Sequence, residues 1–463
     1  MPPHPAYAGS EISRGNFTTE QTKKKEKNKM KKIKLAGIGC GGRTRTYLSL
    51  AKERMSEYFD IVAAADPIIK RAEWLKEFST VDDFKVFDSD KALLAEDKLA
   101  DVVIIGTQDD YHVEPCIAAM KKGYDVLLEK PISPSLKEII HLEKEAKRLG
   151  RKVLICHVLR YSPFYRKVKE IVDSGVLGEI RSLNATEGVG PFHFSHSYVR
   201  GHWSVKEKST PIIIAKSCHD MDIISWLIGE KCVSASSYGS LSYFNKEHAP
   251  EGAPKRCLDG CPHGPNCFFN AANYMFSQRP WLQYVFDKEG EAVAKGSKAT
   301  DNEVREWLKV SPWGRCVFGG CDNNVPDHQT AQFEFEKGKT ATFTVTAFDS
   351  GRNIEIYGTK GSLKGGHTLK HQADTGADII VMDHFSGNKT MHKVNINAGG
   401  YDGHGGGDHG LVSNLYNEMT KENPDDMSSS ISQSIESHIM GFAAEESRMT
   451  GKTVVIENFL KNL

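Results

Sequence analysis

Short apolar runs alternate with longer amphipathic segments over the first third of the chain. The apolar runs have the length of strands buried on both faces, and they occupy residues 31–38, 60–66, 102–105, 125–129 and 152–156. Helical patterns at 114–122 and 136–149 lie between them, and each one ends at a glycine. Strands separated by helices of this length predict an α/β fold with a doubly wound parallel sheet over residues 30–157.

From residue 158 onward, apolar residues recur at every second position instead. Residues 332–336 and 340–348 flank a Lys337-Gly338 turn and predict a β-hairpin. Apolar side chains such as Phe333, Phe335, Phe343 and Val345 then share one face, which a layer of helices must cover. Further strands are expected at 182–186, 233–243 and 352–357, and helices at 164–174, 219–228, 408–420 and 429–449. Residues 158–463 are therefore expected to form an α+β substrate and oligomerisation domain with a large open antiparallel sheet. The second face of that sheet would pair subunits in a homodimer or homotetramer.

Composition narrows the class of protein. The chain of 463 residues has 60 basic and 60 acidic residues, so its charge does not favour a nucleic-acid partner. No apolar run approaches the roughly 18 residues of a transmembrane helix, and no membrane partner is expected. Residues 1–29 are polar and end in a lysine-rich stretch, which predicts a disordered basic tail. Ten cysteines in a chain of this length favour the cytoplasm over a secreted disulfide scaffold.

The first predicted strand ends in a glycine pattern that is typical of dinucleotide binding in a Rossmann-type domain. Gly37 permits a tight turn, Gly39 lets the backbone approach a pyrophosphate, and Gly42 lets the following helix pack closely. The free N–H groups at the helix N-terminus would face the phosphates. The residues expected to contact the cofactor here are Gly37, Gly39, Cys40, Gly41, Gly42 and Arg43. A glycine-rich turn without a ligand is the alternative.

An acidic residue ends the second predicted strand. Asp66 stands where a carboxylate bonds the ribose hydroxyls of the adenosine and repels a 2′-phosphate. It therefore favours NAD over NADP, although Arg71 nearby weakens that preference. The alternative is a plain turn or helix cap before Pro67.

Glu129, Lys130 and Pro131 follow the fourth predicted strand, at the end of the sheet where ligands bind. A lysine at this point can lie beside the nicotinamide and bond a substrate hydroxyl. If its pKa is lowered, it can also exchange a proton with that hydroxyl. A surface lysine in a loop is the alternative.

These three residues, together with the glycine pattern and Asp66, resemble the glucose–fructose oxidoreductase / inositol dehydrogenase (Gfo/Idh/MocA) family. Further matching segments are 107–112, 160–163 and 356–363, and the resemblance extends from residue 31 to 455. It implies a nucleotide-binding domain followed by a sheet-based substrate domain. It also implies a catalytic Lys130 and further cofactor contacts at Thr107, His112, Glu129 and Arg160.

The family resemblance extends to a second segment, in which His219 and Asp222 match the His-x-x-Asp half of a motif facing the nicotinamide. Positions i and i+3 share a helix face, so the carboxylate could hold the histidine in one tautomer while it takes the hydroxyl proton. The acid that the family places four residues before the histidine is absent, because Ala215 stands there with Lys216 beside it. We therefore expect Lys216 to contribute, and we expect closure of the cleft to bring Lys130 and His219 together. A buried histidine without a catalytic role is the alternative.

Two further segments predict substrate contacts. His404 lies in a glycine-rich segment, 403–409, that is similar to segments of family members acting on sugars, and Asp408 is a plausible helix cap there. A polar and aromatic loop suited to stacking on a sugar ring contains His193, His196, Tyr198, Arg200 and Trp203. The substrate contacts expected from it are His193, Tyr198 and Trp203.

Cysteines cluster in a predicted insertion at about 245–322. They are Cys257, Cys261, Cys267, Cys316 and Cys321, and His263 lies among them. Thiolates in tight loops suit tetrahedral zinc, so a structural zinc site is one prediction. The spacings differ from the usual Cys-x-x-Cys pairs, and packed free thiols, a disulfide or an iron–sulfur cluster are the alternatives.

The leading functional hypothesis is an NAD-dependent oxidoreductase acting on a sugar, sugar acid or inositol. A glycosidase or lyase with a retained and recycled NAD is the second hypothesis, and a non-catalytic NAD-binding sensor is the third. Steady release of NADH would support the first, and product without net NADH the second.

Overall fold

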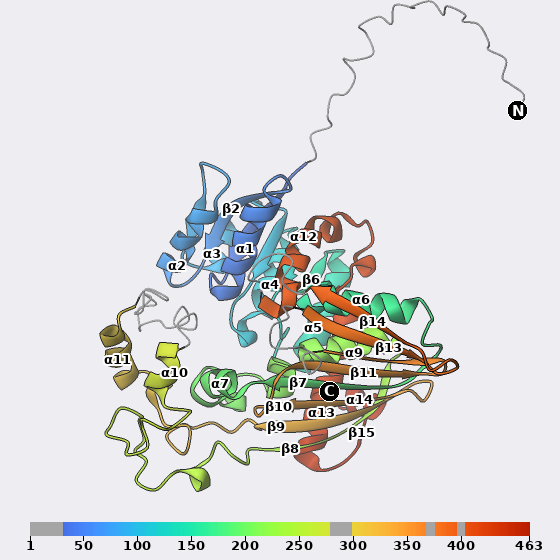
Figure 1. Cartoon of the computed structure of the whole chain (residues 1–463). Coiled ribbons are helices and arrows are strands. Elements are labelled where there is room, and N and C mark those ends of the chain that lie inside the picture. Colours follow the sequence, from blue (N-terminus) through green and yellow to red (C-terminus); the bar gives the residue numbers. More distant parts are fainter. Residues whose placement is uncertain (1–30, 278–298, 367–375, 396–402) are drawn as a thin grey trace, which may run out of the picture.

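The computed structural model describes residues 31–277, 299–366, 376–395 and 403–463. The tail predicted at 1–29 lies outside these residues. Two β-sheets dominate the described chain, and helices cover them (Figure 1).

The N-terminal sheet confirms the doubly wound fold. Its six parallel strands run in the order β3-β2-β1-β4-β5-β6. Their bounds are β1 Ile33–Ile38, β2 Phe59–Ala65, β3 Lys85–Phe87, β4 Val102–Ile105, β5 Asp125–Leu128 and β6 Val153–Ile155. The helices between them are α1 Gly42–Met55, α2 Ile69–Trp74, α3 Asp90–Ala95, α4 Val113–Lys121 and α5 Leu136–Leu149. The strand order reverses between β1 and β4, which creates the crevice where such sheets bind dinucleotides.

Local sequence explains these helices well. In α5 the buried residues Leu136, Ile139, Leu142 and Ala146 recur at helical spacing and face the sheet. The Ser135 side chain caps the N-terminus of α5 by accepting a hydrogen bond from a backbone N–H. A left-handed glycine ends the helix, as predicted.

The second sheet has nine strands in the order β14-β13-β12-β11-β7-β10-β9-β8-β15. Their bounds are β7 Ile180–Val189, β8 Cys232–Ser240, β9 His328–Phe335, β10 Thr340–Thr346, β11 Ser350–Gly358, β12 Gly361–Gly366, β13 Gly376–Asp383, β14 Lys389–Asn395 and β15 Val454–Val455. The pairing is antiparallel except between β7 and β10. The predicted hairpin is confirmed as β9 and β10.

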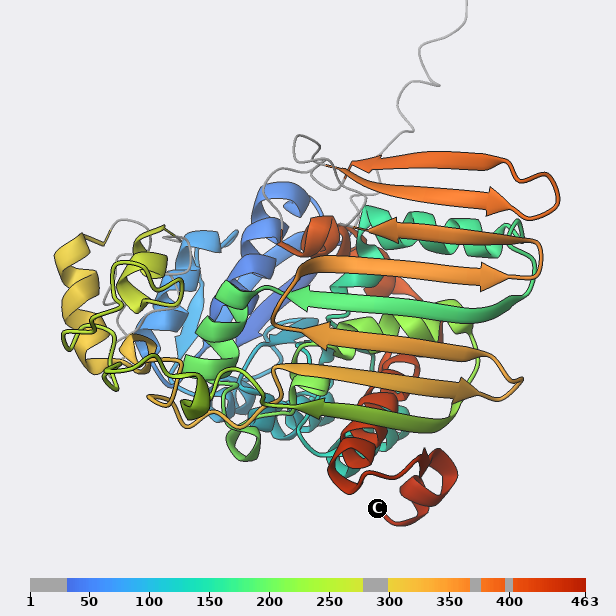
Figure 2. The same ribbon diagram turned by 60° about the horizontal axis from the view of Figure 1, so that its bottom comes forward.

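Helices cover one face of this sheet and leave the other uncovered in the described chain (Figure 2). The covering helices are α6 Pro163–Asp173, α9 Cys218–Ile228 and α13 Ile431–Thr450. Phe333, Phe335, Phe343 and Val345 are all buried. The alternate positions carry polar residues, and the Thr330 and Thr344 hydroxyls are hydrogen-bonded at 3.1 Å. The uncovered face is therefore polar, because the apolar half of the alternation faces the helices.

One predicted helix covers a different sheet from the one expected. Helix α12 (Gly407–Thr420) was expected beside the large sheet, but its buried Leu411 and Leu415 pack with the first domain. It contacts α1 directly. A C-terminal segment thus closes the side of the nucleotide-binding domain.

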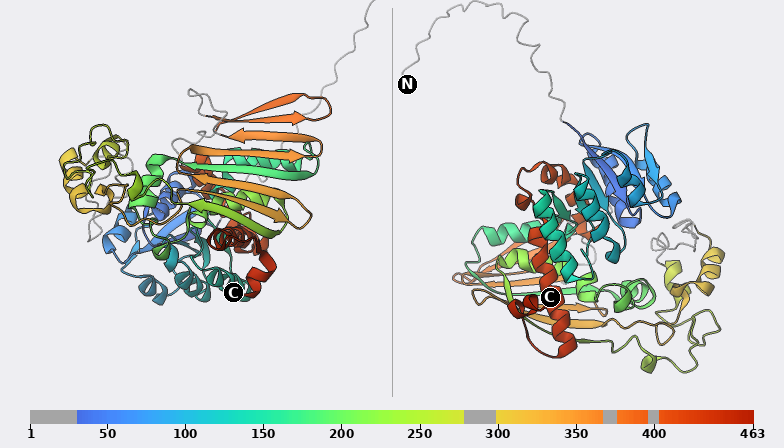
Figure 3. Two further views of the ribbon diagram at one scale, coloured as in Figure 1. Left: turned by 90° about the horizontal axis from the view of Figure 1, so that it is seen from below. Right: turned by 180° about the vertical axis from the view of Figure 1, so that it is seen from behind.

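Several short segments carry the site described below. They are η3 Val158–Tyr161, α7 Pro191–Phe194, the π-helical η4 Ser195–Arg200, α8 Ile212–Ala215 and η11 Gly403–Gly406. The cysteine-rich insertion adds α10 (Ala271–Ser277) and α11 (Asp301–Val310) around a small core of its own. It projects from one end of the large sheet, on the same side as the first domain (Figure 3). No described helix has the length and apolarity needed to cross a membrane.

Candidate active site

The loop between β1 and α1 is closed on its inner side and open on its outer side. Gly39 has φ of +77°, and a methyl group there would lie 2.7 Å from the backbone nitrogen of Thr107. A methyl group at Gly41 would meet nothing within 4 Å. Gly41 also precedes α1, whose N-terminus has no side-chain cap and no acid in its first turn. The free N–H groups of α1 are therefore available to a phosphate, which fits the pyrophosphate of a dinucleotide.

Asp66 follows β2 and is hydrogen-bonded to the backbone of this loop. Its Oδ2 accepts a hydrogen bond from the Cys40 N–H at 2.8 Å, and its Oδ1 accepts one from the Ile68 N–H at 2.8 Å. A carboxylate oxygen can accept a second hydrogen bond. The ribose contact predicted for Asp66 is compatible with this geometry and stays a prediction.

Arg43 and Glu129 form an ion pair beside the glycine loop. The Arg43 Nε donates to Glu129 Oε1 at 2.9 Å, and the Tyr47 hydroxyl donates to the same oxygen at 2.5 Å. Burial opposes ionisation of Glu129, but Arg43 and Lys130 outweigh it and lower the pKa of the carboxyl. Its Oε2 accepts from the Lys130 backbone N–H at 3.0 Å. Glu129 thus holds the strand end that carries Lys130, a role beside the predicted cofactor contact.

Two other predicted cofactor residues connect neighbouring loops. Thr107 follows β4 and lies against Gly39, and its hydroxyl donates to the Tyr111 carbonyl at 2.9 Å. The His112 ring lies between two carbonyl oxygens, 2.8 Å from that of Pro131 and 3.1 Å from that of Thr107. The histidine therefore ties the loop after β4 to the loop that carries Lys130.

Lys130 reaches from the first domain to the second. Its Nζ donates to the carbonyl oxygen of Ala215 at 3.2 Å. Ala215 ends α8, immediately before the helix with His219, so its carbonyl group holds the lysine on the second domain. The described structure therefore has the two sides of the cleft joined through Lys130, and the expectation that Lys130 and His219 meet only on cleft closure stays a prediction.

His219 is buried, and both nitrogens of its ring are unoccupied by hydrogen bonds within the described chain. The residue is only 1% exposed, and neither ring nitrogen has a hydrogen-bond partner among the described residues. Burial, reinforced by the charge of Lys130, holds the pKa of His219 well below its usual range. The ring is therefore neutral near pH 7, and a neutral imidazole can accept a proton. Unpartnered buried nitrogens are costly unless a substrate satisfies them.

Asp222 does not orient His219 as expected. Arg160 takes both of its carboxylate oxygens, with Nε at 2.6 Å and Nη2 at 2.7 Å. Arg160 is itself 4% exposed and also donates to the Ser428 carbonyl and the Gln433 side chain. Arg160 therefore links α9 to α13 in the described structure, and the cofactor contact expected of it stays a prediction.

A buried charge network replaces the missing acid near the site. The Lys216 ammonium lies 3.5 Å from Glu187 Oε1, and Arg352 contacts the second oxygen of Glu187. Arg352 Nε also donates to Asp220 at 2.7 Å. Burial lowers the pKa of Lys216, and Glu187 opposes that effect. Glu187 and Arg352 were not among the predicted site residues. Each is a charged residue within an alternating strand, and only the strand register pairs them.

The predicted substrate loop forms a row of rings. The ring centroids of His193 and Tyr198 lie 6.3 Å apart, and those of Tyr198 and Trp203 lie 6.2 Å apart. The Trp203 Nε1 donates to Asp109 Oδ2 at 3.2 Å. Burial lowers the pKa of His193, and the next cause is the charge of Lys216.

Two other residues of that loop face the insertion. Arg200 donates to the carbonyl oxygens of Phe269 at 2.6 Å and Arg315 at 2.7 Å. The His196 ring lies 5.7 Å from that of Trp313. The insertion thus packs against the aromatic loop and holds it through these contacts.

His404 joins the site from the C-terminal part of the chain. Its ring centroid lies 5.3 Å from that of His219. Its Nδ1 lies 3.2 Å from Asp408 Oδ1, and Arg43 donates to both oxygens of that carboxylate. The structure therefore connects the glycine loop, His404 and His219.

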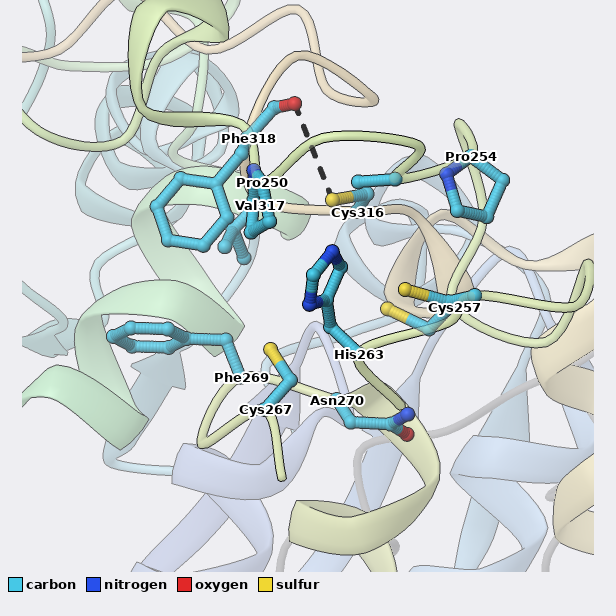
Figure 4. A pocket seen from close by; sticks show the side chains of 12 residues that line it. Pro250, Pro254, Cys257, His263, Cys267, Phe269, Asn270, Cys316, Val317 and Phe318 are labelled. Carbon is cyan, nitrogen blue, oxygen red and sulfur yellow. Dashed lines mark hydrogen bonds between the residues drawn. The ribbon is translucent and has the colours of Figure 1, made fainter. Parts of the chain in front are cut away.

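The cysteines of the insertion do not form the predicted zinc site. Four of them line a small cavity together with His263 (Figure 4), namely Cys257, Cys261, Cys267 and Cys316. No group of three or more potential ligands in the described ranges could hold a metal ion. All ten cysteines are free thiols, and burial raises the pKa of Cys321 to about 11. The Cys321 thiol donates to a backbone carbonyl at 3.4 Å. Zinc is therefore not supported in the part of the chain that the structure describes.

Comparison with known proteins identifies the family. Residues 33–157 match the oxidoreductase family with an NAD-binding Rossmann fold, and residues 169–456 match the C-terminal alpha/beta domain of that family. The chain belongs to the Gfo/Idh/MocA oxidoreductase family. It is accordingly an oxidoreductase with an NAD-binding Rossmann fold.

Similar proteins agree with this assignment. The chain is 25% identical to the "Putative oxidoreductase YteT" of Bacillus subtilis, over 82% of this chain and 88% of that protein. It is 27% identical to the scyllo-inositol 2-dehydrogenase (NAD(+)) of Bacillus subtilis, over 39% of this chain and 50% of that enzyme. An oxidoreductase from Agrobacterium radiobacter, solved with NAD+, L-tartaric acid and magnesium, has the same fold, with a TM-score of 0.64 at 16% identity. That match covers 93% of this chain and 100% of the other.

Proposed function

We propose that this oxidoreductase transfers hydride between NAD and a hydroxyl-bearing carbon of a sugar, sugar acid or inositol. The observation that carries the proposal is the unpartnered, buried ring of His219 beside Lys130, where the two domains meet. The inositol dehydrogenase among its relatives supports a polyol substrate. The working compartment that we expect is the cytoplasm, where free thiols persist.

Bound NAD+ supplies the hydride acceptor, at nicotinamide C4. The glycine loop and the N-terminus of α1 would hold its phosphates, and Asp66 would hold its ribose. Lys130 donates a hydrogen bond to the substrate oxygen and stabilises the negative charge that develops there. His219 accepts the hydroxyl proton through a ring nitrogen, so that a carbonyl forms as the hydride leaves.

The aromatic row of His193, Tyr198 and Trp203 supports the choice of substrate class. Flat rings pack against the C–H faces of a pyranose or cyclitol, while their polar edges bond its hydroxyls. Lys216 adds a buried ammonium group. Inositol dehydrogenases recur among the relatives, which also include a hydratase. Lys130 and His219 are both in place, so the recycled-NAD glycosidase and the non-catalytic sensor are not favoured.

A panel of inositols, sugars and sugar acids, each supplied with NAD+ and read at the NADH absorbance band, tests this function. Steady NADH release with at least one compound is expected. Lys130→Met and His219→Ala should bind NAD as the unmodified protein does and lose about 100- to 10,000-fold in turnover. Lys216→Ala should lose less turnover, because the Lys216 ammonium is already paired with the Glu187 carboxylate.

Lys137→Met and His141→Ala are matched controls on the exposed side of α5 and should keep full activity. Near-normal turnover in the Lys130 variant would overturn the assignment of roles. Product formation without net NADH would instead favour a recycled cofactor.

A further inference from the structure

Oxidation of a hydroxyl group releases one proton for every hydride, and His219 cannot keep that proton. The residue is 1% exposed and lies beside the ammonium of Lys130, so a charged imidazolium there is unfavourable. The proton must therefore pass to a neighbouring group before the next turnover.

Two other histidine rings lie beside His219, and only one of them leads outward. His157, at a centroid distance of 6.0 Å, is fully buried and is followed by His438 at 5.8 Å. The His438 Nε2 accepts from a backbone N–H at 3.1 Å, and its Nδ1 donates to a backbone carbonyl at 3.0 Å. The inward row is therefore closed. His404, at 5.3 Å on the other side, has a side chain that is 22% exposed.

The backbone of His404 is strained in the orientation that serves this contact. Its φ of +57° makes it the one non-glycine residue with positive φ among those that the structure describes. A residue with a Cβ atom avoids this left-handed region, and such strain concentrates at functional sites. The conformation places the ring between His219 and Asp408, whose Oδ1 lies 3.2 Å from Nδ1. Arg43 in turn holds Asp408 with bonds of 2.6 and 3.1 Å.

We propose that His404, oriented by Asp408, takes the substrate proton from His219 and delivers it to water. The C–H electron pair leaves as hydride to NAD+, the O–H electron pair completes the carbonyl, and the proton passes through His219 and His404 to solvent. The His404–Asp408 pair thus supplies a carboxylate beside a histidine. His219 lacks such a carboxylate because Ala215 stands at the position where the family has an acid. This inference rests on the proposed function and assigns one more catalytic residue to it.

The surroundings of His404 suit a transient proton carrier. The charged and titratable groups that face it are Asp408 on its own segment, Arg43 on α1, and His219, Lys216 and His193 from the second domain. Burial lowers the pKa of His404, and the Asp408 carboxylate opposes that effect. A proton that arrives on His404 is therefore stabilised by Asp408 but not trapped.

His404→Gly is the decisive variant, because glycine accepts the same φ without strain and leaves a space for a small base. With myo-inositol as the first probe, or otherwise the panel compound oxidised fastest, turnover should fall at least about 100-fold. NAD affinity should be unchanged, and added imidazole should restore part of the turnover. His141→Gly, on the exposed side of α5, is the control. Its turnover should equal that of the unmodified protein, and added imidazole should not alter it. Turnover within about twofold of the unmodified protein, or a loss that imidazole does not relieve, would overturn the inference.

Asp408→Asn tests the positioning role without a substrate. In a proton NMR titration of the histidine rings with NAD present, the pKa of His404 should fall in Asp408→Asn and stay constant in the exposed control Asp97→Asn. An unchanged His404 titration in Asp408→Asn would contradict the dyad. If the unmodified protein oxidises no compound of the panel, the proposed function fails, and this titration still decides whether Asp408 controls His404.

Discussion

Two glycines of the loop between β1 and α1 allow folding and cofactor binding to be tested separately. At Gly39, φ is +77° and an added methyl group would lie 2.7 Å from the backbone nitrogen of Thr107. Left-handed strain at a non-glycine residue costs about 1–3 kcal/mol, and a clash with backbone cannot be relieved by a side-chain rotation. We expect Gly39→Ala to lower the free energy of unfolding by at least this amount, with or without NAD.

At Gly41 the same methyl group would meet nothing within 4 Å, and φ is −75°. Gly41→Ala should therefore change the free energy of unfolding of the cofactor-free protein by no more than about 0.5 kcal/mol. A pyrophosphate at the N-terminus of α1 would lie against this position, so the methyl group should act only when NAD binds. NAD at about 100 times its Kd stabilises a protein by about 2.7 kcal/mol, and Gly41→Ala should lose most of that gain.

Thermal unfolding with and without NAD, together with calorimetric titration of NAD, measures both effects. Gly175→Ala is the control, because Gly175 has φ of +72° and open space but lies at the end of α6. It should be mildly destabilised and keep the full NAD effect. Full stabilisation of Gly41→Ala by NAD would refute the placement of the cofactor in this loop.

The remaining predictions concern cofactor choice and assembly. Asp66→Ala should weaken NAD binding by about 10- to 100-fold, since it removes a charged acceptor, and should relieve the rejection of NADP. If titration shows that the unmodified protein binds NADP as tightly as NAD or more tightly, the role of Asp66 is contradicted. Light scattering should give the mass of a dimer or tetramer formed through the uncovered face of the large sheet, and a monomer mass would exclude that assembly.

Much of the fold and part of the site were predictable from local patterns. The period of two in β9 and β10 and the helical spacing in α5 depend on neighbouring residues, so the sequence predicted both without the tertiary structure. The glycine loop was predictable for the same reason, since a strand, three spaced glycines and a helix are contiguous. The packing of α12 on α1 was not, because it depends on how distant elements meet.

The sequence by itself determined which elements form and where the cofactor loop and Lys130 lie, because hydrophobic period and turn chemistry act over a few residues. Only the tertiary structure decided which partner each charged group takes. Arg43 bonds a carboxylate 365 positions away at Asp408, and Arg160 occupies the oxygens of Asp222 that were expected to serve His219. Such pairings are decided by burial, since a buried charge bonds whichever opposite charge the packing of distant segments brings within reach.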